Sequence, residues 1–66
     1  MGNIRKAPKN RYRVVGVDTF SDEAGVIGDY YSQSDAIAMA NERGGTMYRT
    51  YVYDDQGQYI HSAGTY

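Results

Sequence analysis

The chain has 66 residues, with seven Lys and Arg against eight Asp and Glu, and a formal net charge of −1. This length gives one small domain with a thin core, which excludes a catalytic cleft between two domains. The absence of cysteine excludes a disulfide framework and a thiolate zinc site. No apolar run approaches a membrane-spanning length, and the polar start lacks the apolar core of a secretory signal, so we predict a cytoplasmic protein without membrane contact.

Charge is distributed unevenly along the chain. The first 13 residues contain five basic residues and no acidic one, whereas all eight acidic residues follow. Because apolar side chains are almost absent from residues 1–9, we expect these residues to form a flexible basic arm and residues 10–66 to form a single domain. The arm contacts phosphate or an acidic partner in one interpretation and is a solvated tail in the other.

Residues 11–18 predict the first strand, because they are rich in β-branched and aromatic side chains. Alternation along a strand places Val15 and Val17 on one face and Tyr12 and Val14 on the other.

The second strand is predicted at residues 26–31, after a polar connection over residues 19–25. The two strands then form a hairpin. Gly16 and Gly28 lie inside these strands, which indicates a bulge or a ring or helix lying close against the sheet.

A helix is predicted to follow. Ser32 lies three residues before Asp35 in a variant of the capping box, and Ser34 is the competing cap. The pair Gly44-Gly45 predicts a left-handed stop after Arg43. The predicted buried stripe consists of small and medium side chains: Ala36, Ile37, Met39 and Ala40.

The second hairpin is predicted from residue 46 to residue 62. Residues 46–53 form its first strand, residues 54–57 a turn with Gly57 in the left-handed region, and residues 58–62 the returning strand. The whole order is ββαββ. We therefore predict an α+β two-layer domain, a four-stranded antiparallel sheet with one helix packed on one face.

The helix start Asp35-Ala36-Ile37 with Ala40, the pair Gly44-Gly45 and the turn Asp55-Gln56-Gly57 form a pattern within residues 26–62. This pattern resembles that of small uncharacterised ββαββ domains of prokaryotes and phages, whose function is unknown. The resemblance implies the fold and carries no activity.

Catalytic and metal-binding patterns are not found in the sequence. His61 is the single histidine, predicted on the last strand on the same face as Tyr59, and it has no cysteine or second histidine as partner. We therefore predict a protein that is not an enzyme, with no catalytic residue, cofactor, metal ligand or small-molecule substrate.

Acidic residues gather in the two hairpin loops. Asp18, Asp22 and Glu23 lie in the first loop, and Asp54 and Asp55 in the second. If both loops fell at the same end of the sheet, five carboxylates could hold a cation, and otherwise they form a solvated acidic edge.

Tyrosine is the unusual residue of this composition, with eight copies and no tryptophan. Alternation sends Tyr51 and Tyr53 to one face and Tyr48 to the other. One helix cannot cover both faces of four strands, so these rings either form a contact surface or lie flat on their own sheet.

Two functions fit this tyrosine-rich sheet. The first is a small protein-interaction domain that binds another protein or a second copy through its tyrosine-rich face or an edge strand. The alternative is a nucleic-acid-binding module, with the basic arm on phosphates and tyrosine and arginine stacking on bases. The residues predicted to bind the partner are Tyr48, Arg49, Tyr51, Tyr53, Tyr59, Arg11 and Arg13.

Overall fold

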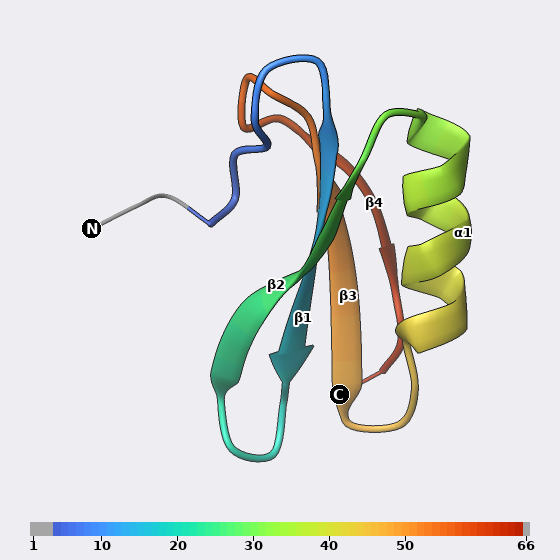
Figure 1. Ribbon diagram of the computed structural model, residues 1–66. Coiled ribbons are helices and arrows are strands. Elements are labelled where there is room, and N and C mark those ends of the chain that lie inside the picture. Colours follow the sequence, from blue (N-terminus) through green and yellow to red (C-terminus); the bar gives the residue numbers. More distant parts are fainter. Residues whose placement is uncertain (1–3, 66) are drawn as a thin grey trace.

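The computed structural model describes residues 4–65 and consists of a four-stranded antiparallel sheet with one helix against one face (Figure 1). The sheet order is β2-β1-β3-β4, so the first strands of the two hairpins pair with each other at the centre of the sheet. The predicted ββαββ fold is therefore confirmed. The elements are β1 (Tyr12–Asp18), β2 (Glu23–Tyr30), α1 (Gln33–Arg43), β3 (Tyr48–Tyr53) and β4 (Tyr59–Ala63).

The first hairpin is longer than the sequence indicated. Strand β2 begins at Glu23, three residues before the predicted start, because Glu23 still pairs with Asp18 across the hairpin. Only residues 19–22 form the turn. The carboxylate of Asp18 closes this turn by accepting the backbone N–H groups of Phe20 at 3.0 Å and Ser21 at 3.3 Å.

Glycines in this hairpin let tyrosine rings approach the sheet on the side of the helix. A Cβ atom at Gly16 would collide with the Tyr48 hydroxyl, and one at Gly28 would lie 2.9 Å from the Tyr30 hydroxyl. The bulge of this hairpin is at Ile27, the extra residue of β2. Both interpretations of the strand glycines, a bulge nearby and a close ring, are confirmed.

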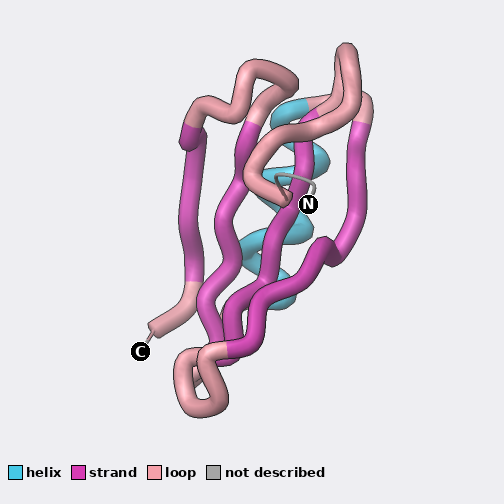
Figure 2. The backbone as a smooth tube through the Cα atoms, turned by 90° about the vertical axis from the view of Figure 1, so that its left-hand side faces the viewer, coloured by secondary structure: helices cyan, strands magenta, loops and turns pink. Residues whose placement is uncertain are grey.

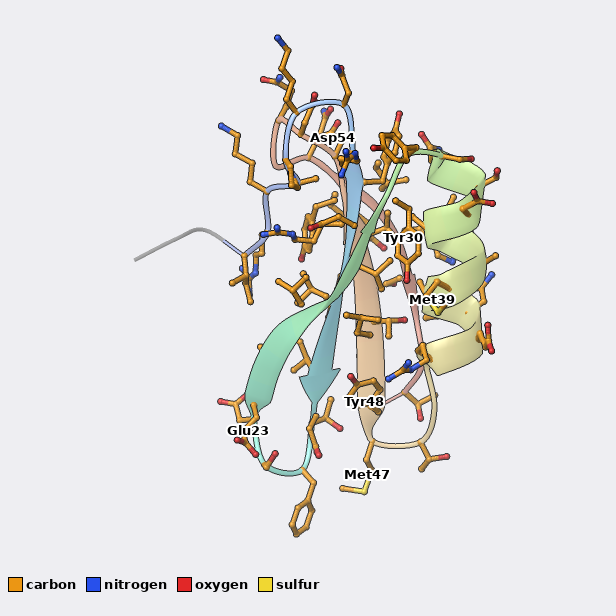
Figure 3. The ribbon with its side chains drawn as sticks, in the orientation of Figure 1. Glu23, Tyr30, Met39, Met47, Tyr48 and Asp54 are labelled. Atoms are coloured by element: carbon orange, nitrogen blue, oxygen red, sulfur yellow. The ribbon has the colours of Figure 1, made fainter. Side chains whose placement is uncertain are left out.

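Helix α1 begins after Ser32, whose side-chain oxygen accepts the Asp35 N–H at 3.4 Å. Ser32 rather than Ser34 is thus the N-cap. Figure 3 shows Tyr30 and Met39 between the sheet and the helix. No helix within residues 4–65 has the length and apolar character needed to cross a bilayer. The buried centre of the core consists of Val14, Ala36, Ala40 and Val52, with Tyr12, Ile27, Tyr30, Ile37, Met39 and Ile60 packed around it.

The end of α1 differs from the prediction. Gly44 has φ −66° and ψ 138°, so it is extended and the predicted left-handed stop is wrong. A Cβ atom at Gly44 would lie 2.9 Å from the backbone nitrogen of Gly64. The glycine is therefore needed because the chain after β4 passes close to the end of the helix.

The turn between β3 and β4 confirms the prediction at Gly57, which has φ +78°. The Asp54 carboxylate accepts the N–H groups of Gln56 at 2.9 Å and Gln58 at 2.8 Å. Asp54 is therefore part of the turn itself.

Strand β4 has a bulge that reverses the predicted face of His61. Tyr59 pairs with Tyr53 and His61 pairs with Val52, so the two residues lie on opposite faces. The Nε2 atom of His61 lies 2.8 Å from Oδ1 of Asn41 on α1. The prediction that His61 shares the face of Tyr59 is wrong, because simple alternation does not count the extra residue of a bulge.

The segment before β1 lies against the sheet face opposite the helix, where Figure 2 shows it in front of the strands. Ala7 is only 5% exposed, and its N–H donates to the Asp54 carbonyl at 3.0 Å. Part of the predicted flexible arm therefore contacts the domain. Residues 1–3 of that arm lie outside the described residues, and its flexibility stays a prediction.

Candidate protein-interaction site

The sheet face opposite α1, called the open face below, is built by alternate residues of all four strands. Register defines it: Val15 pairs with Tyr51 of β3 and Val26 of β2, and Tyr53 pairs with Tyr59 of β4. The residues on this face are Arg13, Val15, Val17, Ala24, Val26, Asp29, Arg49, Tyr51, Tyr53, Tyr59 and Ser62.

Three aromatic rings form a row along the open face. The ring centroids of Tyr51 and Tyr53 are 6.3 Å apart with an interplanar angle of 25°, a stacked arrangement. Tyr53 and Tyr59 are also 6.3 Å apart but meet at 63°, edge to face. The Arg49 guanidinium carbon lies 5.4 Å from the Tyr51 ring centroid, within cation–π range. We call Arg49, Tyr51, Tyr53 and Tyr59 the tyrosine row.

Ser62 holds both ends of the tyrosine row. Its Oγ atom accepts a hydrogen bond from Nη2 of Arg49 at 3.1 Å and another from the Tyr59 hydroxyl at 3.0 Å. These bonds restrict the side chains of Arg49 and Tyr59. A surface ordered before binding loses less conformational entropy when a partner docks.

The charge of Arg13 is balanced on the same face. Its Nε and Nη2 atoms donate to the two Asp29 carboxylate oxygens at 2.7 Å and 3.0 Å, a bidentate ion pair across the hairpin. This hydrogen bond raises the pKa of Arg13 above its ordinary value. The guanidinium of Arg13 is therefore positively charged at physiological pH.

A hollow of about 390 Å³ opens between the strands and the segment before β1. Aliphatic side chains and tyrosine rings line most of it, with two opposite charges at Arg5 and Asp22. Tyr53 beside it is 9% exposed, whereas Tyr59 at the rim of the face is 57% exposed. The lining residues are Ile4, Arg5, Val15, Val17, Asp22, Ala24, Tyr51 and Tyr53.

The structure divides the predicted binding residues among three places. Tyr48 lies on the helix side, over Gly16, as strand alternation predicted. Arg11 lies at the end of the sheet, with its guanidinium carbon 3.8 Å from the Tyr31 ring centroid. The five residues brought together on the open face are Arg13, Arg49, Tyr51, Tyr53 and Tyr59.

Sequence reasoning missed the part of the site contributed by Ile4 and Arg5. A single isoleucine in a polar segment is a weak signal for packing. The usable signal was Ile4 followed by Ala7, two apolar residues in an otherwise polar segment. Val15 and Val17 were correctly placed on one face, but their role as the lining of the hollow depends on register with β3.

The two acidic loops lie at opposite ends of the sheet, as Glu23 and Asp54 show in Figure 3. Five carboxylates therefore do not meet. Asp55 accepts the Asn10 N–H at 2.9 Å, and Asp18 closes its own turn. Within residues 4–65, no three His, Cys, Asp or Glu side chains come together as metal ligands.

No family model, curated protein or solved structure matches this chain. The class of protein is therefore defined by the architecture alone, an α+β ββαββ domain with a tyrosine-rich open face. The resemblance to prokaryotic and phage domains stays a prediction.

Proposed function

We propose that this chain is a non-enzymatic protein-interaction domain and that it binds a second copy of itself through the open face. The observation that carries the proposal is the hollow between the tyrosine row and the segment before β1. Aromatic and apolar groups surrounded by paired polar groups are the composition of interface centres.

The open face is large enough for a stable contact. The molecule measures 31 × 28 × 15 Å, a slab whose two broad sides are the helix side and the open face. A standard interface buries about 800 Å² on each partner, which is about a fifth of the 4308 Å² accessible surface of this chain.

The edges of the sheet are poorer candidates than its face. Both edge strands, β2 and β4, contain a register shift, and β4 has only five residues. Bulges and short length at an edge interrupt the row of backbone groups that a new strand would need. We therefore assign binding to the face and not to strand addition.

A second copy suits the charges of this face. Arg5 and Asp22 both line the hollow and have opposite signs. In a two-fold dimer, each surface meets itself reversed, so the positive part of one copy can approach the negative part of the other. The formal net charge of −1 gives little repulsion between copies.

A nucleic-acid partner is the competing proposal. The Arg49 guanidinium beside Tyr51 and the basic segment before β1 favour it. Against it, the rings of the row contact one another and Arg13 is neutralised by Asp29. Base stacking needs free ring faces, so a protein surface is the better match.

The test is a matched pair of variants, Ala24→Arg and Ala38→Arg. Both alanines are exposed, but Ala24 lies on the open face and Ala38 on α1. In sedimentation experiments we expect the parent and Ala38→Arg to approach twice 7.4 kDa as concentration rises, and Ala24→Arg to stay monomeric.

The salt dependence of binding distinguishes a protein partner from a nucleic-acid partner. A tyrosine-centred dimer should respond weakly to salt, whereas oligonucleotide binding should fall steeply with it. The dimer proposal would be contradicted if the parent chain stayed monomeric and bound a mixed oligonucleotide in a strongly salt-dependent manner. That result would support the nucleic-acid-binding module instead.

A further inference from the structure

A pocket of about 440 Å³ lies on the helix side of the sheet, between the β1–β2 hairpin and the end of α1. Figure 1 shows this hairpin extending beyond the last turn of α1, so no helix lies over its end. We call this space the hairpin pocket. Each of the four elements around it contributes one polar side chain to the lining: Asp18 of β1, Glu23 of β2, Arg43 of α1 and Tyr48 of β3.

The floor of the hairpin pocket contains two glycines. Gly16 and Gly25 lie opposite each other on β1 and β2 and have no side chain to fill the space. A Cβ atom at Gly25 would meet no atom within 4 Å, whereas one at Gly16 would collide with the Tyr48 hydroxyl and approach the Ile27 side chain. The Tyr48 ring and Ile27 therefore form an apolar wall beside an open floor.

The neighbouring row of residues places two carboxylates side by side. Asp18 pairs with Glu23 on one side and with Tyr48 on the other. Asp18 keeps its negative charge, because it closes its turn only by accepting N–H groups, both at Oδ1. Among residues 4–65, the Glu23 carboxylate and Oδ2 of Asp18 have no hydrogen-bond or ion-pair partner. Like charges in opposite positions repel each other, and a bound cation would relieve that repulsion.

Arg43 brings one positive charge to the same pocket. It lies exposed in the last turn of α1, and in the described part of the chain no ion pair joins it to a carboxylate. The charged groups of the lining are thus two carboxylates and one guanidinium. A ligand with two cationic groups and one carboxylate provides a partner of opposite charge for each of them.

We propose that the hairpin pocket binds a free basic amino acid, of the class of arginine and lysine. Its ammonium group and its side-chain cation meet Asp18 and Glu23, and its carboxylate meets Arg43. The methylene groups of the ligand pack over the glycine floor and against the apolar wall. A volume of about 300–1,000 Å³ with a few polar groups among apolar ones is typical of small-molecule sites. The pocket lies on the helix side, so this site is separate from the open-face dimer.

The test is an NMR titration of the isotope-labelled chain with L-arginine. We expect saturable shifts of the amide signals of Gly16, Gly25 and Tyr48, and sodium chloride at the same ionic strength is the control. Agmatine lacks the carboxylate of arginine, and N-acetyl-L-arginine lacks its ammonium group. Each should bind about fivefold more weakly than arginine, because each loses one solvent-exposed ion pair.

Glu23→Gln and Glu42→Gln form a matched pair of variants. Both glutamates are exposed, so neither change should unfold the domain, but only Glu23 lines the pocket. We expect Glu23→Gln to weaken arginine binding about fivefold and Glu42→Gln to leave it unchanged. Arg43→Gln should abolish the preference for arginine over agmatine, because the carboxylate of the ligand then has no cationic partner.

Three results would overturn the amino-acid site. The first is amide shifts no larger than those that sodium chloride causes. The second is equal weakening by Glu23→Gln and Glu42→Gln, which would show only a general attraction of cations to the chain. The third is equal binding of arginine and agmatine by the parent chain, which would remove Arg43 from the site.

Discussion

Single glycines decide which tyrosine rings can lie flat on this sheet. Gly16 gives room to Tyr48 and Gly28 gives room to Tyr30, both on the side of the helix. On the open face, Tyr51 and Tyr53 instead stack on each other. The two interpretations of the tyrosines, rings covering their own sheet and rings forming a surface, therefore apply to different faces of the same sheet.

The conformation of Gly57 gives a prediction at this scale. Gly57→Ala should destabilise the domain by about 1–2 kcal/mol, because φ +78° is costly for any residue with a Cβ atom. Gly25→Ala is the matched control, since a Cβ there meets no atom within 4 Å. Urea denaturation measures both, and equal stability of the two variants would contradict the turn assignment.

At the scale of elements, the segment before β1 is the point on which prediction and structure differ most. A basic, polar composition predicts a flexible arm, yet Ala7 is 5% exposed and bonded to the backbone of Asp54. If the segment stays packed, it forms one side of the hollow on the open face. Its packing therefore bears on the fold and on the proposed interface together.

Ala7→Asp tests that packing. Burial of a carboxylate without a partner should lower the free energy of unfolding by about 1–3 kcal/mol. Ala38→Asp places the same group on the exposed side of α1 and should cost about 0.5 kcal/mol from helix propensity. If Ala7→Asp is as stable as Ala38→Asp in urea, the segment before β1 is flexible. Ile4 and Arg5 would then not form one side of the hollow.

Much of the fold could be read from local patterns, and the exceptions have physical causes. Alternation correctly separated Val15 and Val17 from Val14, and Tyr51 and Tyr53 from Tyr48, because strands have a period of two. The predicted face of His61 was wrong because a bulge adds one residue to β4. Bulges depend on pairing between strands and leave no reliable mark in one segment.

The candidate site was predictable only in part for the same reason. Within the tyrosine row, the common face of Tyr51 and Tyr53 follows from local alternation, whereas the position of Tyr59 beside Tyr53 depends on the register of β4 with β3. Ile4 and Arg5 also line the hollow. They lie there because the segment before β1 packs against the sheet, and the polar sequence of that segment does not predict such packing. The predicted left-handed stop at Gly44 was wrong for a similar reason. Gly44 has to be a glycine because the backbone of Gly64, 20 positions further along the chain, passes close to it.

For the whole molecule, the slab has two broad sides, of which α1 covers one and the other is the open face (Figure 1). The open face carries aromatic rings and paired charges, which favours a closed, two-fold contact.

The most direct test of the open-face interface is an isotope-filtered NOE experiment on a mixture of labelled and unlabelled chains. In a two-fold dimer, ring protons of Tyr51 and Tyr59 in one copy should show cross-copy NOEs to the methyl groups of Val17 and Val26 in the other, because these side chains of the open face keep exposed surface. Cross-copy NOEs confined to α1 or to the ends of the sheet, or none from a sample that sediments as a dimer, would contradict the proposal.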